Sequence, residues 1–186
     1  IIVNAESNGG QAWGVSGNNN VSMSAEKGDI RMDVKGATNA YGVWGGRYQA
    51  NGEMELLVEG GTGTSSGIHS MGMTNTAVKA GQVNIDVLNT GANEGSGTYG
   101  DNARAMGAYT YDRPTTDIEA GAIKVKATAQ GHADAYGLRV DRPNSSYDTK
   151  TTLTRAPASG TAAAPPPPAH APHAHSGAQH PAVTAA

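Results

Sequence analysis

The sequence predicts an all-β fold, a right-handed parallel β-helix (β-solenoid) of about five coils. Two observations predict it. A glycine followed by strict polar–apolar alternation recurs along the chain, and a second glycine-centred motif follows each copy. A unit this small cannot bury its own apolar face, so the copies must stack on one another. The 26 glycines in 186 residues fit a chain with many tight turns.

The first element of each unit is a strand that begins after a glycine. Alternation of polar and apolar residues indicates a strand with one buried face. The copies span Gly28–Val34, Gly52–Val58, Gly81–Val87 and Gly121–Ala127. In register, their apolar positions form three columns that we expect to be buried: Ile30, Met54, Val83 and Ile123; Met32, Leu56, Ile85 and Val125; Val34, Val58, Val87 and Ala127. The same register predicts a surface ion pair between Arg31 and Glu55.

The second element is a short strand around a glycine, as in Ala40-Tyr41-Gly42-Val43. Alternation predicts that Tyr41 and Val43 point the same way and that Trp44 points to water. The position equivalent to Trp44 holds, in the successive copies, Ser16, Trp44, His69, Tyr109 and Arg139. Beside this row, the glycine column is expected to form a shallow groove. The candidate contact residues for a ligand or partner are therefore Trp44, His69, Tyr109 and Arg139.

A third element closes each unit just before the next glycine. Its copies are Val21–Ala25, Tyr48–Ala50, Val78–Ala80 and Ile118–Ala120. The segment 89–104, rich in glycine and asparagine, is predicted to be a loop that projects from a corner of the solenoid. It offers oxygen ligands of the kind that Ca²⁺ uses, at Asn93, Glu94, Asp101 and Asn102. Their spacing matches neither an EF-hand nor a glycine-aspartate nonapeptide repeat, so a plain polar loop is the other interpretation.

Two domains are predicted: a β-solenoid over residues 1–154 and an extended Pro/Ala/His-rich tail over residues 155–186. Pro165–Pro168 favours polyproline II. The tail also holds four histidines, His170, His173, His175 and His180. Such a tract either binds Zn²⁺ or Ni²⁺ weakly or is a flexible spacer. We assign no metal site and no cofactor.

Composition excludes several classes of protein. The net charge is −3 and no basic block is present, which argues against nucleic-acid binding. No apolar run reaches the length of a membrane span. The chain has no cysteine and hence no disulfide. Together with the Gly/Asn/Thr-rich repeats, this favours an extracellular location, and the start inside a strand suggests a processed product.

No catalytic residue is predicted, and we expect the protein not to be an enzyme. Carboxylates do occur in pairs, as Asp29 with Asp33 and Glu53 with Glu55. They alternate along the repeat as the solvated face of any strand does. No set of nucleophile and base accompanies them.

The recurring Ala-Tyr-Gly-Val/Leu and Gly-x-Ile-x-Val-x-Ala motifs, over residues 1 to about 140, resemble passenger domains of bacterial autotransporters and related repeat adhesins. The resemblance implies a right-handed β-helix at the bacterial cell surface, used for adhesion or as a structural fibre. We expect a structural or adhesive β-solenoid that assembles head-to-tail with copies of itself through the bare strand at Ile1, Ile2 and Val3. Host or bacterial glycans are the other candidate partners. The alternatives are a passenger fragment of a monomeric adhesin and a carbohydrate-active β-helix enzyme.

Overall fold

The computed structural model describes residues 1–17, 19–90, 103–130, 134–141 and 149–156. This part of the chain is all-β, as predicted, and every strand pairing in it is parallel. The strands are β1 (Ile2–Ser7), β2 (Ala12–Ser16), β3 (Ser22–Ala25), β4 (Ile30–Gly36), β5 (Ala40–Trp44), β6 (Gly46–Gly60), β7 (Thr64–Met71), β8 (Thr76–Asn89), β9 (Arg104–Tyr111), β10 (Thr115–Ala129), β11 (Asp134–Asp141) and β12 (Lys150–Arg155).

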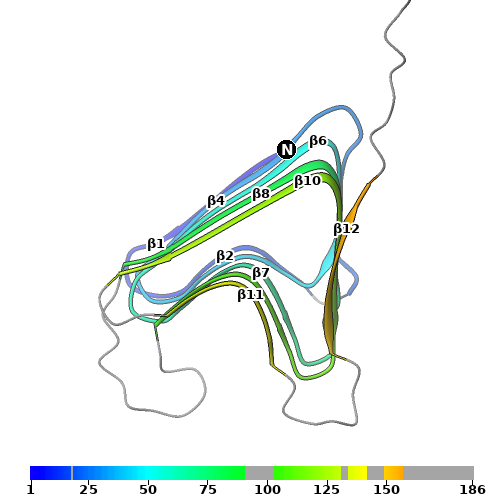
Figure 1. The fold of residues 1–186 in the computed structure, drawn as a ribbon. Coiled ribbons are helices and arrows are strands. Elements are labelled where there is room, and N and C mark those ends of the chain that lie inside the picture. Colours follow the sequence, from blue (N-terminus) through cyan, green and yellow to red (C-terminus); the bar gives the residue numbers. More distant parts are fainter. Residues whose placement is uncertain (18, 91–102, 131–133, 142–148, 157–186) are drawn as a thin grey trace, which may run out of the picture.

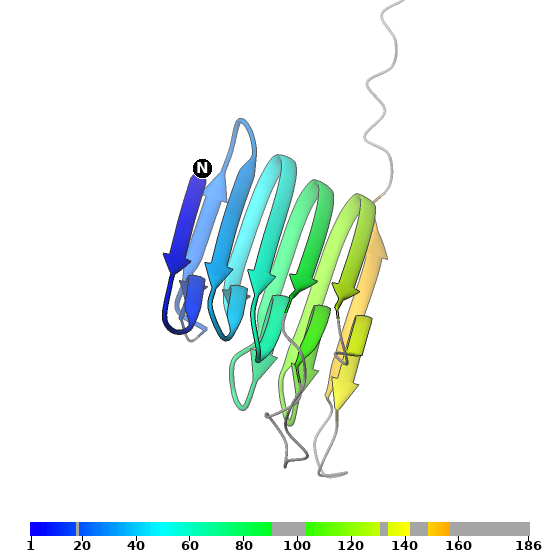
Figure 2. The ribbon, with the colours of Figure 1, turned by 90° about the vertical axis from the view of Figure 1, so that its left-hand side faces the viewer.

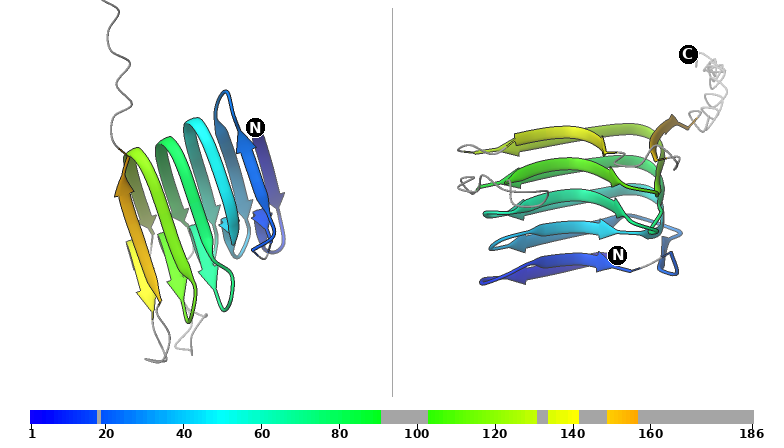
Figure 3. Two further views of the ribbon diagram at one scale, coloured as in Figure 1. Left: turned by 90° about the vertical axis from the view of Figure 1, so that its right-hand side faces the viewer. Right: turned by 90° about the horizontal axis from the view of Figure 1, so that it is seen from below.

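The strands form two sheets. The seven-stranded sheet has the order β1-β4-β6-β8-β10-β12, with β3 also paired to β6, and the five-stranded sheet has the order β11-β9-β7-β5-β2. Seen along the stack, the larger sheet bends round a corner and forms two sides of a three-sided outline, and the smaller sheet forms the third side (Figure 1). Successive rungs lie side by side in chain order (Figure 2 and Figure 3). The arrangement is thus β-solenoid-like.

The third and first predicted elements are one continuous strand in β6, β8 and β10, not two strands separated at a glycine. The glycine lies inside each long strand, and the pairing between neighbouring long strands skips it. A β-carbon at Gly81 would lie 2.8 Å from the carbonyl oxygen of Gly52, and one at Gly121 would lie 2.8 Å from that of Gly81. Glycine therefore lets the strand bend where rungs stack too closely for a side chain.

The register confirms the three predicted core columns. Ile30 pairs with Met54, Met54 with Val83 and Val83 with Ile123. All members of the columns are buried except those on β10, which are half-buried. Val3 and Ala5 of β1 pair with Met32 and Val34 and continue two of the columns by one rung. The predicted Arg31–Glu55 pair is also present, with 2.7 Å between Nη1 and Oε2.

Part of the interior is polar, which the sequence did not predict. A row of hydroxyl groups crosses three rungs where the two sheets meet. Ser70 and Thr76 share a hydrogen bond of 2.7 Å between their side-chain oxygens, and so do Thr110 and Thr116. Thr116 donates to Ser70 over 2.8 Å, and Thr110 lies 2.8 Å from Thr151. Because the hydroxyls satisfy one another, they can be buried at little cost.

Strand β12 lies after the recurring motifs, which extend to about residue 140, and almost wholly inside the solenoid domain predicted over residues 1–154. It pairs with β10, with Thr151 beside Thr116 and Leu153 beside Ile118. Its run of threonines masks the alternation because a threonine replaces an apolar residue on the inner face. The candidate calcium ligands, at 93, 94, 101 and 102, and the tail histidines lie outside the described residues.

Candidate functional site: an aromatic hollow on the five-stranded sheet

The glycine column of the five-stranded sheet faces the interior, not a groove on the outside as predicted. A β-carbon at Gly67 would lie 2.3 Å from Cγ2 of Ile85, and one at Gly107 would lie 2.0 Å from Cγ1 of Val125. Glycine thus lets the middle of this sheet approach the opposite sheet. The sheet bows inward there, and its outer surface is concave (Figure 1).

The bend at the glycine changes which residues face outward. Pairings between neighbouring strands skip the glycine, as in Trp13 with Tyr41 and then Val15 with Val43. Val43 belongs to the hydrophobic core, whereas the ring of Tyr41 lies 4.8 Å from that of His69. The prediction that Tyr41 points the same way as Val43 is therefore wrong. The strand bends inward at Gly42, and the side chains of Tyr41 before the bend and Trp44 after it both turn to the concave side. Strict alternation fails for this reason.

The register places Trp44 beside His69, His69 beside Tyr109 and Tyr109 beside Arg139, so the predicted row exists. The rings of Trp44 and His69 stack, with 4.2 Å between centroids. The His69 and Tyr109 rings meet edge-on at 5.1 Å. Further rings extend the contacts into one cluster, which we call the aromatic cluster: Trp13, Tyr41, Trp44, His69, Tyr109 and Tyr111.

The row is less exposed than predicted. Trp44 and Arg139 are half-buried, but His69 is only 4% exposed and Tyr109 only 8%. Burial has electrostatic consequences. It lowers the pKa of His69 to about 3, so the imidazole is neutral near pH 7. It raises the pKa of Tyr41 to about 12, and for Tyr109 burial and the neighbouring Asp141 carboxylate both raise the pKa.

The concave face contains a hollow of about 460 Å³. Its walls include Tyr41, Trp44, His69, Arg104, Tyr109 and Tyr111. Three buried nitrogen atoms in these walls lack a hydrogen-bond partner: Nδ1 and Nε2 of His69 and Nε of Arg104. Buried polar atoms are nearly always paired, so unpaired ones in side chains that line a cavity indicate a place for a ligand. We call this cavity the aromatic hollow.

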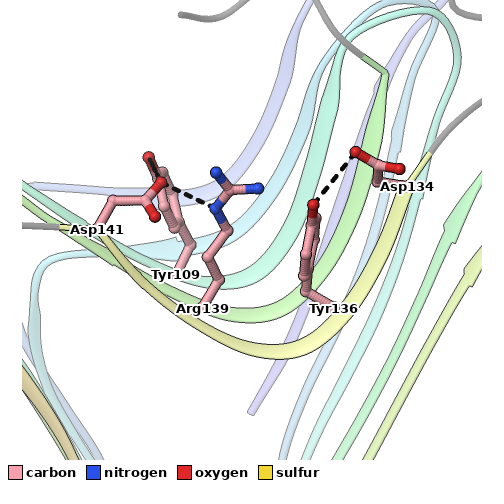
Figure 4. A network of polar contacts seen from close by, with 5 residues as sticks. All are labelled: Tyr109, Asp134, Tyr136, Arg139 and Asp141. Atoms are coloured by element: carbon pink, nitrogen blue, oxygen red, sulfur yellow. Dashed lines mark hydrogen bonds and ion pairs between the residues drawn. The ribbon is translucent and has the colours of Figure 1, made fainter.

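Arg139, the fourth predicted contact residue, is engaged within the protein (Figure 4). Its Nε donates to Oδ2 of Asp141 over 2.8 Å, and the Tyr109 hydroxyl donates to the same oxygen over 3.1 Å. The guanidinium carbon lies 4.6 Å from the centre of the Tyr136 ring. The Tyr136 hydroxyl in turn donates to Asp134 over 3.2 Å. This network lies beside the row on β9 and β11.

Sequence reasoning missed Tyr41 and Arg104. The only signal for Tyr41 in the sequence is its place before a glycine, where continued alternation predicts the same direction as for Val43. Arg104 stands at the end of the segment predicted as a loop, yet it begins β9 and pairs with Thr64 in the register. The place of Arg104 in the wall of the hollow could be found only once the register of β9 was known.

The remaining predicted features lie elsewhere. Of the strand at the N-terminus, Ile1 is 49% and Ile2 73% exposed, and Val3 packs against the core. Glu55 pairs with Arg31, and Asp29 accepts a hydrogen bond of 2.7 Å from the backbone N–H of Glu53. In the described ranges, no group of three potential metal ligands occurs, and no helix is long and apolar enough to cross a membrane.

Comparison of the chain with protein-family models, with curated proteins and with solved structures gives no match.

Proposed function

We propose that this chain is a right-handed parallel β-helix from an extracellular bacterial surface protein, and that it is an adhesive scaffold which binds a glycan in the aromatic hollow. The observation that carries the proposal is the hollow itself, a concave cavity lined by aromatic rings and by buried nitrogens without partners. The right hand follows from the strong preference of parallel strand crossovers for that hand. The surface location rests on the resemblance of the repeats to autotransporter passengers.

A sugar ring suits such a cavity because it has two kinds of surface. Its C–H faces are apolar and pack on aromatic rings, while its hydroxyl groups point outward around the edge. The hollow supplies rings from Tyr41, Trp44 and Tyr109, and polar atoms from His69 and Arg104. Its volume lies in the range of small-ligand sites, which is about 300 to 1,000 Å³.

The rest of the molecule supports a scaffold. Stacked columns fill the interior, and ion pairs link neighbouring rungs on the outer faces, as in Lys79 with Glu119 and Lys126 with Asp86, each at 3.0 Å. Each exposed pair stabilises the fold by at most about 1 kcal/mol. Repetition along the stack holds the concave face in a fixed shape, which a binding surface requires.

We favour binding over hydrolysis of a carbohydrate. A glycosidase needs two carboxyl groups about 5 to 10 Å apart at its site. Among the described residues, the walls of the aromatic hollow include no aspartate or glutamate. Release of reducing sugar from a bound glycan would favour the enzyme instead.

The test is a glycan array and a cell-adhesion assay with the purified chain. Trp44→Ser removes a half-buried wall of the hollow and is expected to abolish binding with the fold intact by circular dichroism. Met73→Ser is the control, since Met73 is 75% exposed and lies outside the hollow. Equal binding by both variants and the wild type would rule out the hollow as the contact surface.

Self-assembly into a head-to-tail fibre is a second candidate function. The first rung exposes Ile1 and Ile2, and the last described strands expose Leu138, Val140 and Leu153. The strands β1 and β12 are edges of their sheet, with unpaired backbone groups that can recruit another strand. A monomeric adhesin segment is the alternative, and sedimentation separates the two.

A further inference from the structure

We propose that the aromatic hollow is specific for a pyranose ring that carries a carboxylate, with Arg104 pairing with the carboxylate and His69 bonding a ring hydroxyl. This inference rests on the proposed glycan binding and adds the chemical class of the sugar. Hexuronic acids and sialic acids share that chemistry.

Arg104 is the charged group that distinguishes this hollow from a neutral sugar site. Its side chain lines the cavity, its Nε is buried without a partner, and no ion pair of Arg104 occurs among the described residues. Asp134 lies beside Arg104 in the register, but its carboxylate accepts the hydrogen bond from Tyr136. A guanidinium with an unused donor at Nε in a partly desolvated site favours an anionic oxygen ligand.

His69 selects for a hydroxyl group. The side chain is 4% exposed, stacks on Trp44 and has no partner at either nitrogen. A neutral imidazole presents one donor and one acceptor. A hydroxyl group, which both donates and accepts, complements it better than an anion or a cation does.

The shape of the cavity calls for a ring rather than a simple anion. Ser66 stands between Tyr41 and Met106 in the register and is fully buried. The small side chain of Ser66 turns inward on its own strand, where its hydroxyl donates to the carbonyl oxygen of Ile68 over 2.7 Å. Tyr41 and Met106 both line the cavity, with the smaller, buried Ser66 between them. A cavity of about 460 Å³ has room for a whole sugar ring, whereas acetate or phosphate would fill only a small part of it.

The experiment is calorimetric titration of the whole chain at pH 7 with three oligosaccharides: a glucuronate-containing one, its glucose counterpart of the same linkage, and a sialylated one. We expect a carboxylated sugar to bind at least about tenfold more tightly than the neutral counterpart, as a charged hydrogen bond would give. Preference for glucuronate or for sialic acid supports the proposal and identifies the source of the carboxylate.

Variants of Arg104 and His69 test whether these two residues bind the sugar as proposed. Arg104→Gln is expected to reduce affinity for the acidic sugar to that for the neutral one. Arg47→Gln makes the same charge change at an exposed position of β6, outside the hollow, and should leave the ratio unchanged. His69→Phe should weaken both sugars alike. Equal affinity of the wild type for acidic and neutral sugars would overturn this inference and leave the proposed function standing, and binding of no sugar would overturn both.

Discussion

The side chain of His69 is almost wholly removed from water, and neither ring nitrogen has a partner among the described residues. Burying such a group costs about 1 to 3 kcal/mol relative to a paired one. Stacking on Trp44 at 4.2 Å and edge contact with Tyr109 at 5.1 Å offset part of that cost. The remaining cost calls for an explanation, and a ligand that bonds the imidazole would supply one.

Replacement of His69 by phenylalanine is expected to remove a pH dependence of stability. The folded pKa is about 3, below the usual value of 6.5, so the unfolded chain binds the extra proton between these values. This contribution to stability is therefore full above pH 6.5 and falls as the pH drops toward 3. At about 1.4 kcal/mol per pH unit, the wild type should lose about 3 kcal/mol more than His69→Phe between pH 6.5 and pH 4.

The measurement is the free energy of unfolding in urea as a function of pH, for both proteins. Carboxylates that titrate in the same range are common to both and cancel in the difference. Parallel pH profiles would show that the His69 imidazole is accessible to protons in the folded state.

Ile85 tests the core columns. It is 2% exposed, between Leu56 and Val125 on the neighbouring rungs. Ile85→Ala should cost about 2 to 5 kcal/mol through the lost contacts and the cavity left behind. Ile85→Asp should prevent folding, because it buries an unpaired charge. Leu57→Ala, on the outer face of the same sheet, is the control and should cost far less in a thermal melt.

At the scale of the element, the glycine column of the five-stranded sheet sets the shape of the hollow. Gly107→Ala would place a β-carbon 2.0 Å from Val125 and 2.4 Å from the carbonyl oxygen of Gly137. We expect a loss of about 1 to 3 kcal/mol from overpacking, together with weaker ligand binding as the sheet is pushed outward. Gly137→Ala is a matched control, since no atom lies within 4 Å of its added β-carbon. Similar denaturation midpoints for the two variants would contradict the inward bend.

The strands also show how much of the structure could be predicted from the sequence alone. Alternation after each glycine predicted the core columns, because a flat strand with one buried face has a period of two. It failed at Tyr41, where the bend at Gly42 breaks that period. It also failed for the hydroxyl row of Ser70, Thr110 and Thr116, because small polar residues in a strand look solvated until their neighbours on other rungs are known. The place of Arg104 in the wall of the hollow depends on the register of β9, which spacing alone does not predict.

At the scale of the whole molecule, the exposed apolar side chains of the terminal rungs predict association. Sedimentation of the full chain over a range of concentrations should show growth into larger species, and removal of residues 1–5 should prevent it. Ile2→Lys is a milder variant that should weaken association by adding a charge to a 73% exposed position. A full-length chain that remains monomeric at high concentration would exclude the fibre and leave the adhesive segment.

The two tryptophans of the chain, Trp13 and Trp44, both lie in the aromatic cluster, with 4.7 Å between their ring centroids. Their fluorescence therefore reports on the aromatic cluster, and Trp44 is the one of the two that lines the aromatic hollow. The most direct test is titration of a Trp13→Phe variant, in which Trp44 is the sole reporter, with the carboxylated oligosaccharide. We predict a saturable change in Trp44 emission with the same midpoint as the calorimetric binding curve. Binding by calorimetry without any change in Trp44 emission would contradict the account, because the sugar would then occupy another surface.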